Sequence, residues 1–260
     1  MGNEKYFDFG ENWSQYSEIA LTQESLDSAI SSMQTLVGIE SLENLSFLDV
    51  GCGSGLFSIA AHKLNATKVV GIDINPVCID VSNRNSQKYS PDSSIIFRKG
   101  SALDPNLLPE YGQFDIVYTW GSLHHTGSMW NAIFEVSKLV KPNGIYALSI
   151  YNKHFTSPIW KMIKRTYNFM PGVGKKIIIA KFVAIIFIAK YLVTGRNPFE
   201  KERGMDFKYD VVDWVGGFPY EYAKPQEIID FLGELDIKLI RYFPAQVPTG
   251  CNEFVFKCNT

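Results

Sequence analysis

The sequence is poor in cysteine, and its four cysteines form no CxxC pair. Cysteines paired at that spacing are typical of structural zinc sites and redox motifs, so nothing here favours either class. One of the four, Cys52, lies inside a glycine-rich segment, where a disulfide would obstruct a ligand loop. We therefore expect free thiols in a reducing, cytoplasmic setting, at Cys52, Cys78, Cys251 and Cys258.

A secretory leader pattern is also missing, because the N-terminus is polar and acidic. The formal net charge is only −2, but the charges are unevenly distributed. Residues 152–203 carry eleven Lys or Arg against two acids, a balance of +9, which leaves −11 for the remainder of the chain. The long apolar run Ile177 to Val193 is interrupted by two lysines and is too short to predict a membrane-spanning helix.

The most informative stretch that is present runs from Phe47 to Gly55, FLDVGCGSG, and is followed by the apolar residues 56–61. This order predicts a buried strand, a glycine turn and a helix, which is the phosphate- or nucleotide-binding start of an α/β fold. Glycines at positions 51, 53 and 55 let main-chain N–H groups approach a ligand closely. We therefore place a nucleotide site at Gly51, Cys52, Gly53 and Gly55.

Two acids refine that site. Asp73 ends a second apolar strand, KVVGID, where a carboxylate is suited to bind two ribose hydroxyls. NAD-binding folds share this feature, but their third glycine would fall at position 56, which is Leu56. Asp49 precedes the glycines and could hold the cationic end of a nucleotide that carries an amino acid.

In these motifs the chain resembles the class I S-adenosylmethionine (SAM)-dependent methyltransferases, from about Leu45 to Tyr151. The resemblance implies SAM as cofactor, with Asp49 and the glycines at its methionine end and Asp73 at the ribose. It also implies an aromatic lid before the first strand and adenine contacts after the third. The lid residue would be Trp13 or Tyr16, and the adenine contact would be Ser101 or the main chain of Ala102. Ile74 and Trp120 are further candidate cofactor residues.

Strand and helix patterns alternate through residue 151 and resume after residue 220. We predict a doubly wound, seven-stranded, mostly parallel Rossmann-like sheet of the α/β class, whose last strand is antiparallel. Residues 1–44 would form an N-terminal helical arm, with helices ending near Gly38, and 45–151 the cofactor-binding core. Residues 152–220 would form an inserted α-helical cap, and 221–260 would complete the sheet.

The loop after the fourth strand, WGSLHHTGSMW, carries two adjacent histidines, with Ser128 as a candidate helix cap. Ligands bind at the carboxyl ends of such strands, so His124 or His125 is a candidate general base with a pKa near the working pH. A purely structural role is the alternative. Metal ligation is disfavoured because no acid cluster flanks the pair. The stretch also resembles that of quinone-methylating methyltransferases.

A second candidate region, residues 205–221, concentrates acids and aromatics around a Gly-Gly turn, which we interpret as a loop. We expect it to contribute to an acceptor site, together with the stretch before the last strand. The candidate substrate residues are Asp210, Asp213, Trp214, Glu221 and Asn252.

The apolar, basic insert has three interpretations. Its long helix packs on the core or on another subunit, or residues 160–193 lie on an anionic membrane surface, or the cap forms a basic pocket for an anionic substrate. Nucleic acid is disfavoured, because aliphatic residues rather than aromatics separate the basic ones.

The sequence therefore predicts methyl transfer from SAM to a small-molecule acceptor, at oxygen, the acceptor being anionic or lipid-linked. A membrane-surface quinone or lipid methyltransferase, peripheral at the inner face of the membrane, is one alternative. A non-catalytic partner subunit with the same fold is another. The sequence leaves the oligomeric state open.

Overall fold

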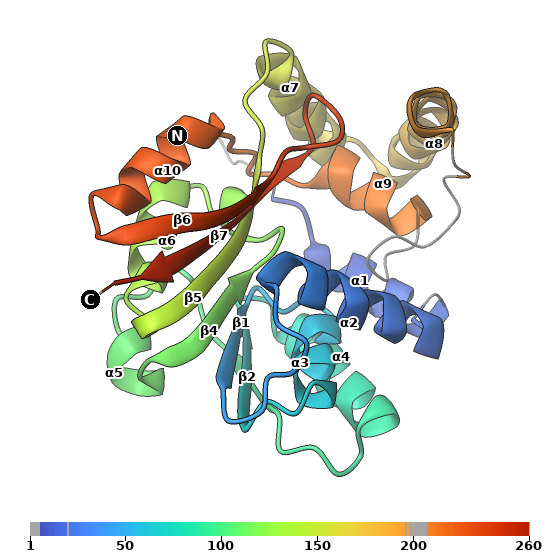
Figure 1. Cartoon of the computed structure of the whole chain (residues 1–260). Helices are drawn as coiled ribbons and strands as arrows, with labels where there is room; N and C mark the ends of the chain where they lie inside the picture. Colours follow the sequence, from blue (N-terminus) through green and yellow to red (C-terminus); the bar gives the residue numbers. More distant parts are fainter. Residues whose placement is uncertain (1–5, 20, 196, 198–206, 260) are drawn as a thin grey trace.

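The computed structural model of the chain describes residues 6–19, 21–195, 197 and 207–259. Seven strands form one sheet in the order β3-β2-β1-β4-β5-β7-β6 (Figure 1). Only β7 is antiparallel to its neighbours, β5 and β6. The prediction of a seven-stranded, mostly parallel sheet is thus confirmed. The strands are β1 Ser46–Val50, β2 Lys68–Asp73, β3 Ile96–Lys99, β4 Phe114–Thr119, β5 Val140–Tyr151, β6 Ile237–Phe243 and β7 Cys251–Cys258.

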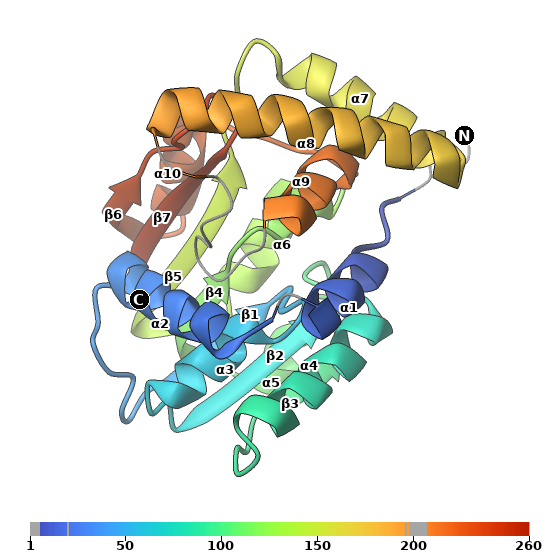
Figure 2. The same ribbon diagram turned by 90° about the vertical axis from the view of Figure 1, so that its right-hand side faces the viewer.

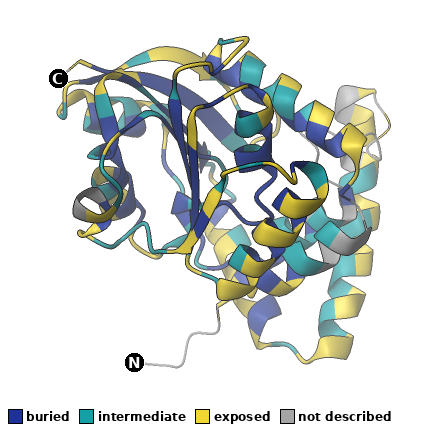
Figure 3. Ribbon diagram, turned by 90° about the horizontal axis from the view of Figure 1, so that it is seen from below, coloured by how far each residue is buried: buried dark blue, intermediate teal, exposed yellow. Residues whose placement is uncertain are grey.

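Helices cover both faces of this sheet. On one face α6 (Met129–Ser137) and α10 (Pro225–Gly233) bury their apolar side chains in a core cluster with β4, β5 and β7. On the other face α2 (Gln23–Val37) and α3 (Leu56–Lys63) do the same. Figure 3 shows the buried residues concentrated along the strands. The remaining crossovers contain α4 (Pro76–Tyr89) and α5 (Leu107–Tyr111).

The N-terminal arm forms two helices, α1 (Phe9–Ile19) and α2. The Thr22 side chain accepts a hydrogen bond from Ser25 N and so caps the start of α2. Gly38 ends this helix in the left-handed conformation, with φ 80°, as the sequence predicts. The two helices lie on the same side of the sheet as the cap (Figure 1).

The insert after β5 consists of α7 (Ser157–Phe169), α8 (Gly172–Thr194) and α9 (Phe207–Gly216). Figure 2 shows α8 extended across the top of the molecule, above α9. The interpretation of residues 205–221 as a loop is wrong for most of its length. Phe207, Val211 and Val215 recur at helical spacing and are buried against α7 and α8, which stabilises a helix there.

Helix α8 is neither fully buried nor fully exposed. One side, which includes Phe182, Val183 and Ile186, packs against α7 and α9. The opposite side exposes a row of residues at helical spacing, Val173, Ile177, Lys181, Ile188 and Leu192. No helix in the described part of the chain is long and apolar enough to cross a membrane.

Candidate cofactor and active site

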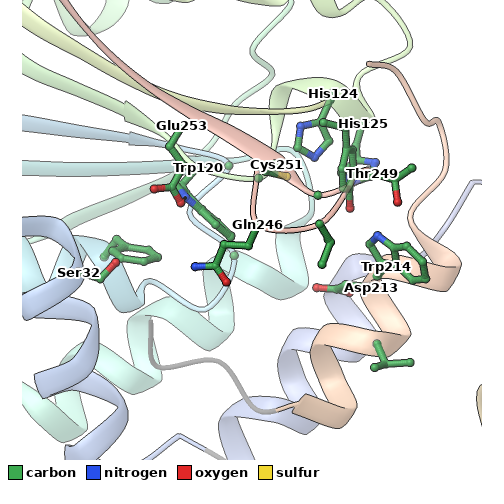
Figure 4. Close-up of a pocket in the computed structure, with 18 of the residues that line it drawn as sticks. Ser32, Trp120, His124, His125, Asp213, Trp214, Gln246, Thr249, Cys251 and Glu253 are labelled. Atoms are coloured by element: carbon green, nitrogen blue, oxygen red, sulfur yellow. Dashed lines mark hydrogen bonds between the residues drawn. The ribbon is translucent and has the colours of Figure 1, made fainter. Parts of the chain in front are cut away.

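A cavity of about 970 Å³ lies between the carboxyl ends of the central strands and the cap. Its walls come from the glycine loop after β1, the loop after β4, the β6–β7 connection and helices α2, α8 and α9. Figure 4 shows side chains from these segments pointing into one space. An open cavity therefore lies where the sequence predicts the site, at the ends of the strands, and the cap forms one side of it.

The glycine loop is the floor of the cavity. Gly51 has φ 79°, and a Cβ on it would overlap the Ser122 side chain. A Cβ on Gly53 would lie 3.1 Å from the ring of Trp13, which covers the loop. Both positions need glycine because the main chain is closely approached from two directions. Cys52 lines the cavity as a buried free thiol.

Asp49 lies at the end of β1 beside this loop and is buried. Its carboxylate accepts a hydrogen bond from Ser58 Oγ at 2.7 Å. Burial, opposed by that hydrogen bond, raises the pKa of Asp49 to about 7. A buried acid of this kind is stabilised in its charged form by a cation, and the amino group of a bound methionine moiety supplies one.

Asp73 ends β2 next to the glycine loop, as the sequence predicts. Its two carboxylate oxygens accept main-chain hydrogen bonds, from Gly53 N at 3.0 Å and Asn75 N at 2.8 Å. Burial raises the pKa of Asp73 from its usual value, although both hydrogen bonds oppose this effect. The acid therefore orders the loop and remains able to accept further bonds from ribose hydroxyls.

Asp73 and the other residues assigned to the nucleoside do not line the cavity. Ile74 follows Asp73 and is 68% exposed. Ser101 and Ala102 follow β3, where Ser101 Oγ accepts a hydrogen bond from Leu103 N at 3.2 Å. They follow the end of β3, which lies next to Asp73.

The two tryptophans assigned to the cofactor both line the cavity, Trp13 from α1 and Trp120 from the end of β4. Trp120 Nε1 donates to Glu253 Oε1 at 2.9 Å, and Figure 4 shows the two side chains next to each other. Tyr16 belongs to α1, but its side chain lies outside the described residues.

His124 is almost completely buried, with 1% of its surface exposed. Its ring lies 4.1 Å from that of Tyr151 and 4.4 Å from that of His125, between centroids. Burial and the neighbouring charges of His125 and Lys164 lower its pKa well below the usual range. His124 borders the cavity, but its neutral imidazole is enclosed by the rings of Tyr151 and His125 and is poorly placed to receive a proton.

His125 is less enclosed and has a defined orientation. Its Nδ1 lies 2.7 Å from the carbonyl oxygen of Pro219. Because a carbonyl can only accept a hydrogen bond, Nδ1 carries the ring hydrogen and is the donor. Burial, with a smaller contribution from the charge of Lys164, lowers the pKa of His125 to about 3. The prediction that His125 has a pKa near the working pH is therefore not supported. Instead, His125 is neutral at physiological pH and its Nε2 is a hydrogen-bond acceptor.

Two of the candidate substrate residues, Asp213 and Trp214 of α9, line the cavity. Asn12 Nδ2 donates to Asp213 Oδ1 at 2.7 Å. The Trp214 ring packs against that of Trp160 of α7, with 4.0 Å between centroids and an angle of 55° between the ring planes. Asp210 lies in the same helix, with a side chain outside the described part of the structure.

Glu221 and Asn252 do not line the cavity. The Glu221 carboxylate accepts the main-chain hydrogen bond of Met129 at 3.1 Å and so caps α6, a role that the sequence assigned to Ser128. Asn252 Oδ1 accepts from Tyr242 Oη and from Ala245 N, both at 3.0 Å, and orders the β6–β7 turn. Both side chains are therefore structural in this arrangement.

Sequence reasoning missed Lys164, which is buried behind the histidines although its sequence context does not indicate this. Glu253, which lines the cavity, was expected at the acceptor site only as part of the stretch before the last strand. Gly217 was noted only as part of a turn, but a Cβ there would lie 2.7 Å from His125 Cε1. Within the described residues, no group of three His, Cys, Asp or Glu side chains is arranged to hold a metal.

Comparisons with known proteins place this chain in a family. Residues 41–185 match the methyltransferase domain model. Ubiquinone biosynthesis O-methyltransferase of Pelagibacter ubique is 32% identical over 198 residues, 76% of this chain and 63% of that protein. Demethylmenaquinone methyltransferase of Lactococcus lactis is 30% identical over 147 residues, 55% of this chain and 56% of that protein. The chain thus spans less than two thirds of these relatives.

Magnesium protoporphyrin IX methyltransferase of Synechocystis, solved with bound S-adenosylhomocysteine, has the same fold. It superposes with a TM-score of 0.55 at 17% identity, over 90% of this chain and 82% of that one. The chain belongs to the class I SAM-dependent methyltransferase family, and the predictions of family and cofactor are confirmed. The buried acid Asp49 and the crowded glycines fit the methionine end of SAM.

Replacing Asp73 tests the cofactor site. Asp73→Ala removes a charge-assisted acceptor, worth roughly 1.5–3 kcal/mol per hydrogen bond. We expect SAM affinity to fall at least about tenfold, measured by isothermal titration calorimetry. Asp80→Ala, at an exposed acid of α4, is the control and should bind SAM normally. Unchanged SAM affinity in a folded Asp73→Ala protein would exclude Asp73 from the site.

Proposed function

We propose that the protein transfers the methyl group of SAM to a hydroxyl oxygen of a small acceptor that has an apolar, lipid-linked part. The observation that carries the proposal is the path of the cavity. It joins the glycine loop and His125 to the inner side of α8, where Phe182, Ile185 and Ile186 form an apolar wall. An acceptor with a polar head and an apolar tail fits both ends.

SAM supplies a methyl group already activated on a sulfonium, so the protein mainly has to position the acceptor. His125 Nε2 accepts the hydrogen bond of the acceptor hydroxyl, because Nδ1 is committed to Pro219. The oxygen then forms a bond to the methyl carbon as the carbon–sulfur bond breaks, and the hydroxyl proton leaves by way of Nε2. The rings of Trp13, Trp160 and Trp214 form an aromatic part of the cavity wall.

The charges of the cavity favour the lipid-linked acceptor over the anionic one. No Lys or Arg is found among the described residues that line it, whereas Asp49, Asp213 and Glu253 do line it. An anionic acceptor would enter a wall of carboxylates, which disfavours its binding. We therefore propose a neutral head group.

The relatives support this choice. The Pelagibacter protein is an O-methyltransferase of ubiquinone biosynthesis, and the Lactococcus protein methylates demethylmenaquinone. By its name, each acts in quinone metabolism. We extend to this chain only the acceptor type, a hydroxylated ring with an apolar tail.

A pair of probe acceptors tests the proposal. Catechol and a prenylated catechol share the same hydroxyls and differ in the tail. With radiolabelled SAM, we expect methyl ether formation from both and a KM at least about tenfold lower for the prenylated probe, because each buried CH₂ contributes about 0.8 kcal/mol. Equal KM values would contradict a tail site. SAM binding without transfer to either probe would favour the non-catalytic subunit.

The prenylated probe also tests His125. His125→Ala should lower kcat by about 10²-fold or more, as is typical for loss of a proton acceptor, with SAM affinity unchanged. Since the pKa of His125 is lowered to about 3, the wild-type rate should show no histidine inflection between about pH 5 and 8. A His125→Ala enzyme with the wild-type kcat would show that positioning alone suffices.

We further propose that the cap, residues 152–220, rests on an anionic membrane surface, which would give such an acceptor a route to the cavity. The row on α8 exposes Val173 (73%), Ile177 (53%), Ile188 (58%) and Leu192 (76%). The exposed faces of α7 and α8 also carry Lys161, Arg165, Lys176 and Lys181. Apolar side chains bordered by cations suit the boundary between lipid head groups and acyl chains.

Sedimentation with vesicles checks this surface. The wild-type protein should sediment with phosphatidylserine vesicles and less so as salt rises, because each basic residue near the surface adds about 1 kcal/mol that salt screens. The double variant Ile177→Asp/Ile188→Asp should lose binding. Ile185 and Phe187 are unsuitable for this test, since Ile185 lines the cavity and Phe187 packs against Phe207.

The control is Ile240→Asp, at an exposed isoleucine of β6, which should bind vesicles like the wild type. Absence of wild-type binding at low salt would end the membrane proposal. The proposal of a lipid-linked acceptor would then be tested separately, by the assay with catechol and prenylated catechol.

A further inference from the structure

Lys164 of α7 is fully buried, with 0% of its surface exposed, although lysine is rarely enclosed in this way. Its ammonium group lies over three aromatic rings, 4.8 Å from the centroid of Tyr220, 5.3 Å from that of Tyr151 and 5.8 Å from that of Trp214. Such rings stabilise a cation. Placing a charge inside an apolar domain is costly, so the position calls for a specific role.

The ammonium group donates a hydrogen bond to the main-chain carbonyl of Trp214. One turn further along α7, Asn168 Nδ2 donates to the carbonyl of Gly216 at 2.7 Å. Both carbonyls belong to the last turn of α9, where carbonyl groups have no partner within the helix and where a positive charge is favourable. Lys164 and Asn168 together cap the end of α9.

The chain that leaves this helix end supports the histidines. Gly217 contacts the ring of His125 so closely that a Cβ would meet it. The carbonyl of Pro219 holds the Nδ1 proton of His125, at 2.7 Å. Glu221 N donates to the carbonyl of His124 at 3.0 Å. The position of the C-terminal end of α9 therefore determines the position of the His125 imidazole.

We infer that Lys164 is a positioning residue, which fixes the end of α9 and thereby keeps His125 in the tautomer that leaves Nε2 unprotonated. The inference rests on the role proposed for His125. It assigns Lys164 no contact with substrate or cofactor, since Lys164 lies behind the cavity wall formed by Tyr151 and Trp214.

Protonation of Lys164 provides a way to observe the coupling. The groups that face it are His124 and His125 from the loop after β4, Asp213 from α9, Cys251 from β7, and the phenols of Tyr151 and Tyr220. Burial lowers the pKa of Lys164 from 10.5 to about 7. Near neutral pH, a positive charge beside His125 therefore appears as the pH falls.

The same shift makes folding stability depend on pH. Between about pH 7 and 10.5 the unfolded chain binds the lysine proton and the folded chain does not. The free energy of unfolding therefore rises with pH across this window. Lys164→Met lacks the titrating group, so the part of the rise due to Lys164 should disappear in that variant.

Nitrogen NMR of ¹⁵N-histidine-labelled protein tests the inference directly, without an acceptor. In the wild type, we expect His125 to be a single Nδ1–H tautomer, assigned by comparison with His125→Ala. In Lys164→Met we expect mixed tautomers and a His125 protonation midpoint raised by about one pH unit or more, toward its ordinary value. Lys161→Met is the matched control, because Lys161 is an exposed lysine one turn earlier in α7.

A folded Lys164→Met protein with wild-type His125 tautomer and midpoint would overturn the inference, since a merely structural lysine changes stability alone. If that variant does not fold, ¹⁵N-lysine labelling of the wild type replaces it. The His125 signals should then shift with the same midpoint as Lys164, and His125 signals that stay constant through that midpoint would overturn the inference. Neither result depends on methyl transfer, so failure of the proposed function is seen separately in the catechol assay.

Discussion

The hydrogen bond from His125 Nδ1 to the carbonyl of Pro219, at 2.7 Å, joins the Rossmann-like core to the cap. His125 follows a strand of the sheet, whereas Pro219 follows the last helix of the cap. Two residues further on, Glu221 binds the same loop twice, through its main-chain N–H to His124 and its carboxylate to Met129. One short segment thus fixes the loop after β4, and the histidines cannot be placed by the Rossmann-like core alone. The cap is for this reason part of the proposed chemistry as well as a cover.

The sheet and the glycine loop could be predicted because their signals are local. FLDVGCGSG contains a strand, a turn and a helix start within a few residues, and the left-handed glycines of the structure occur where the pattern requires them. Asp73 was found by the same logic, since parallel strands bring their carboxyl ends to one edge of the sheet. Patterns of this kind can be predicted from the sequence because the residues that form them are neighbours in the chain.

The parts that could not be predicted depend on contacts between distant residues. Helix α9 was interpreted as a loop because its sequence is rich in acids and glycine, and its buried stripe is apparent only once α7 and α8 lie against it. Glu221 was assigned to the acceptor, but it caps a helix that begins 92 residues earlier. The two histidines looked equivalent in sequence, and only the packing of Tyr151 and Pro219 distinguishes the enclosed His124 from His125.

Charge shows most clearly how composition and structure can diverge. The balance of +9 in residues 152–203 made a basic pocket a reasonable alternative. In the folded chain the described lysines and arginines of the cap lie outside the cavity, mostly on exposed faces, while three carboxylates line its interior. The charged end of a lysine or arginine side chain is more stable in water than against the wall of a cavity. Lys164 departs from this rule, and its aromatic rings and helix carbonyls replace water as partners. Cations outside and acids inside would serve two separate purposes: attraction to an anionic surface, and admission of a neutral head group to the methyl donor.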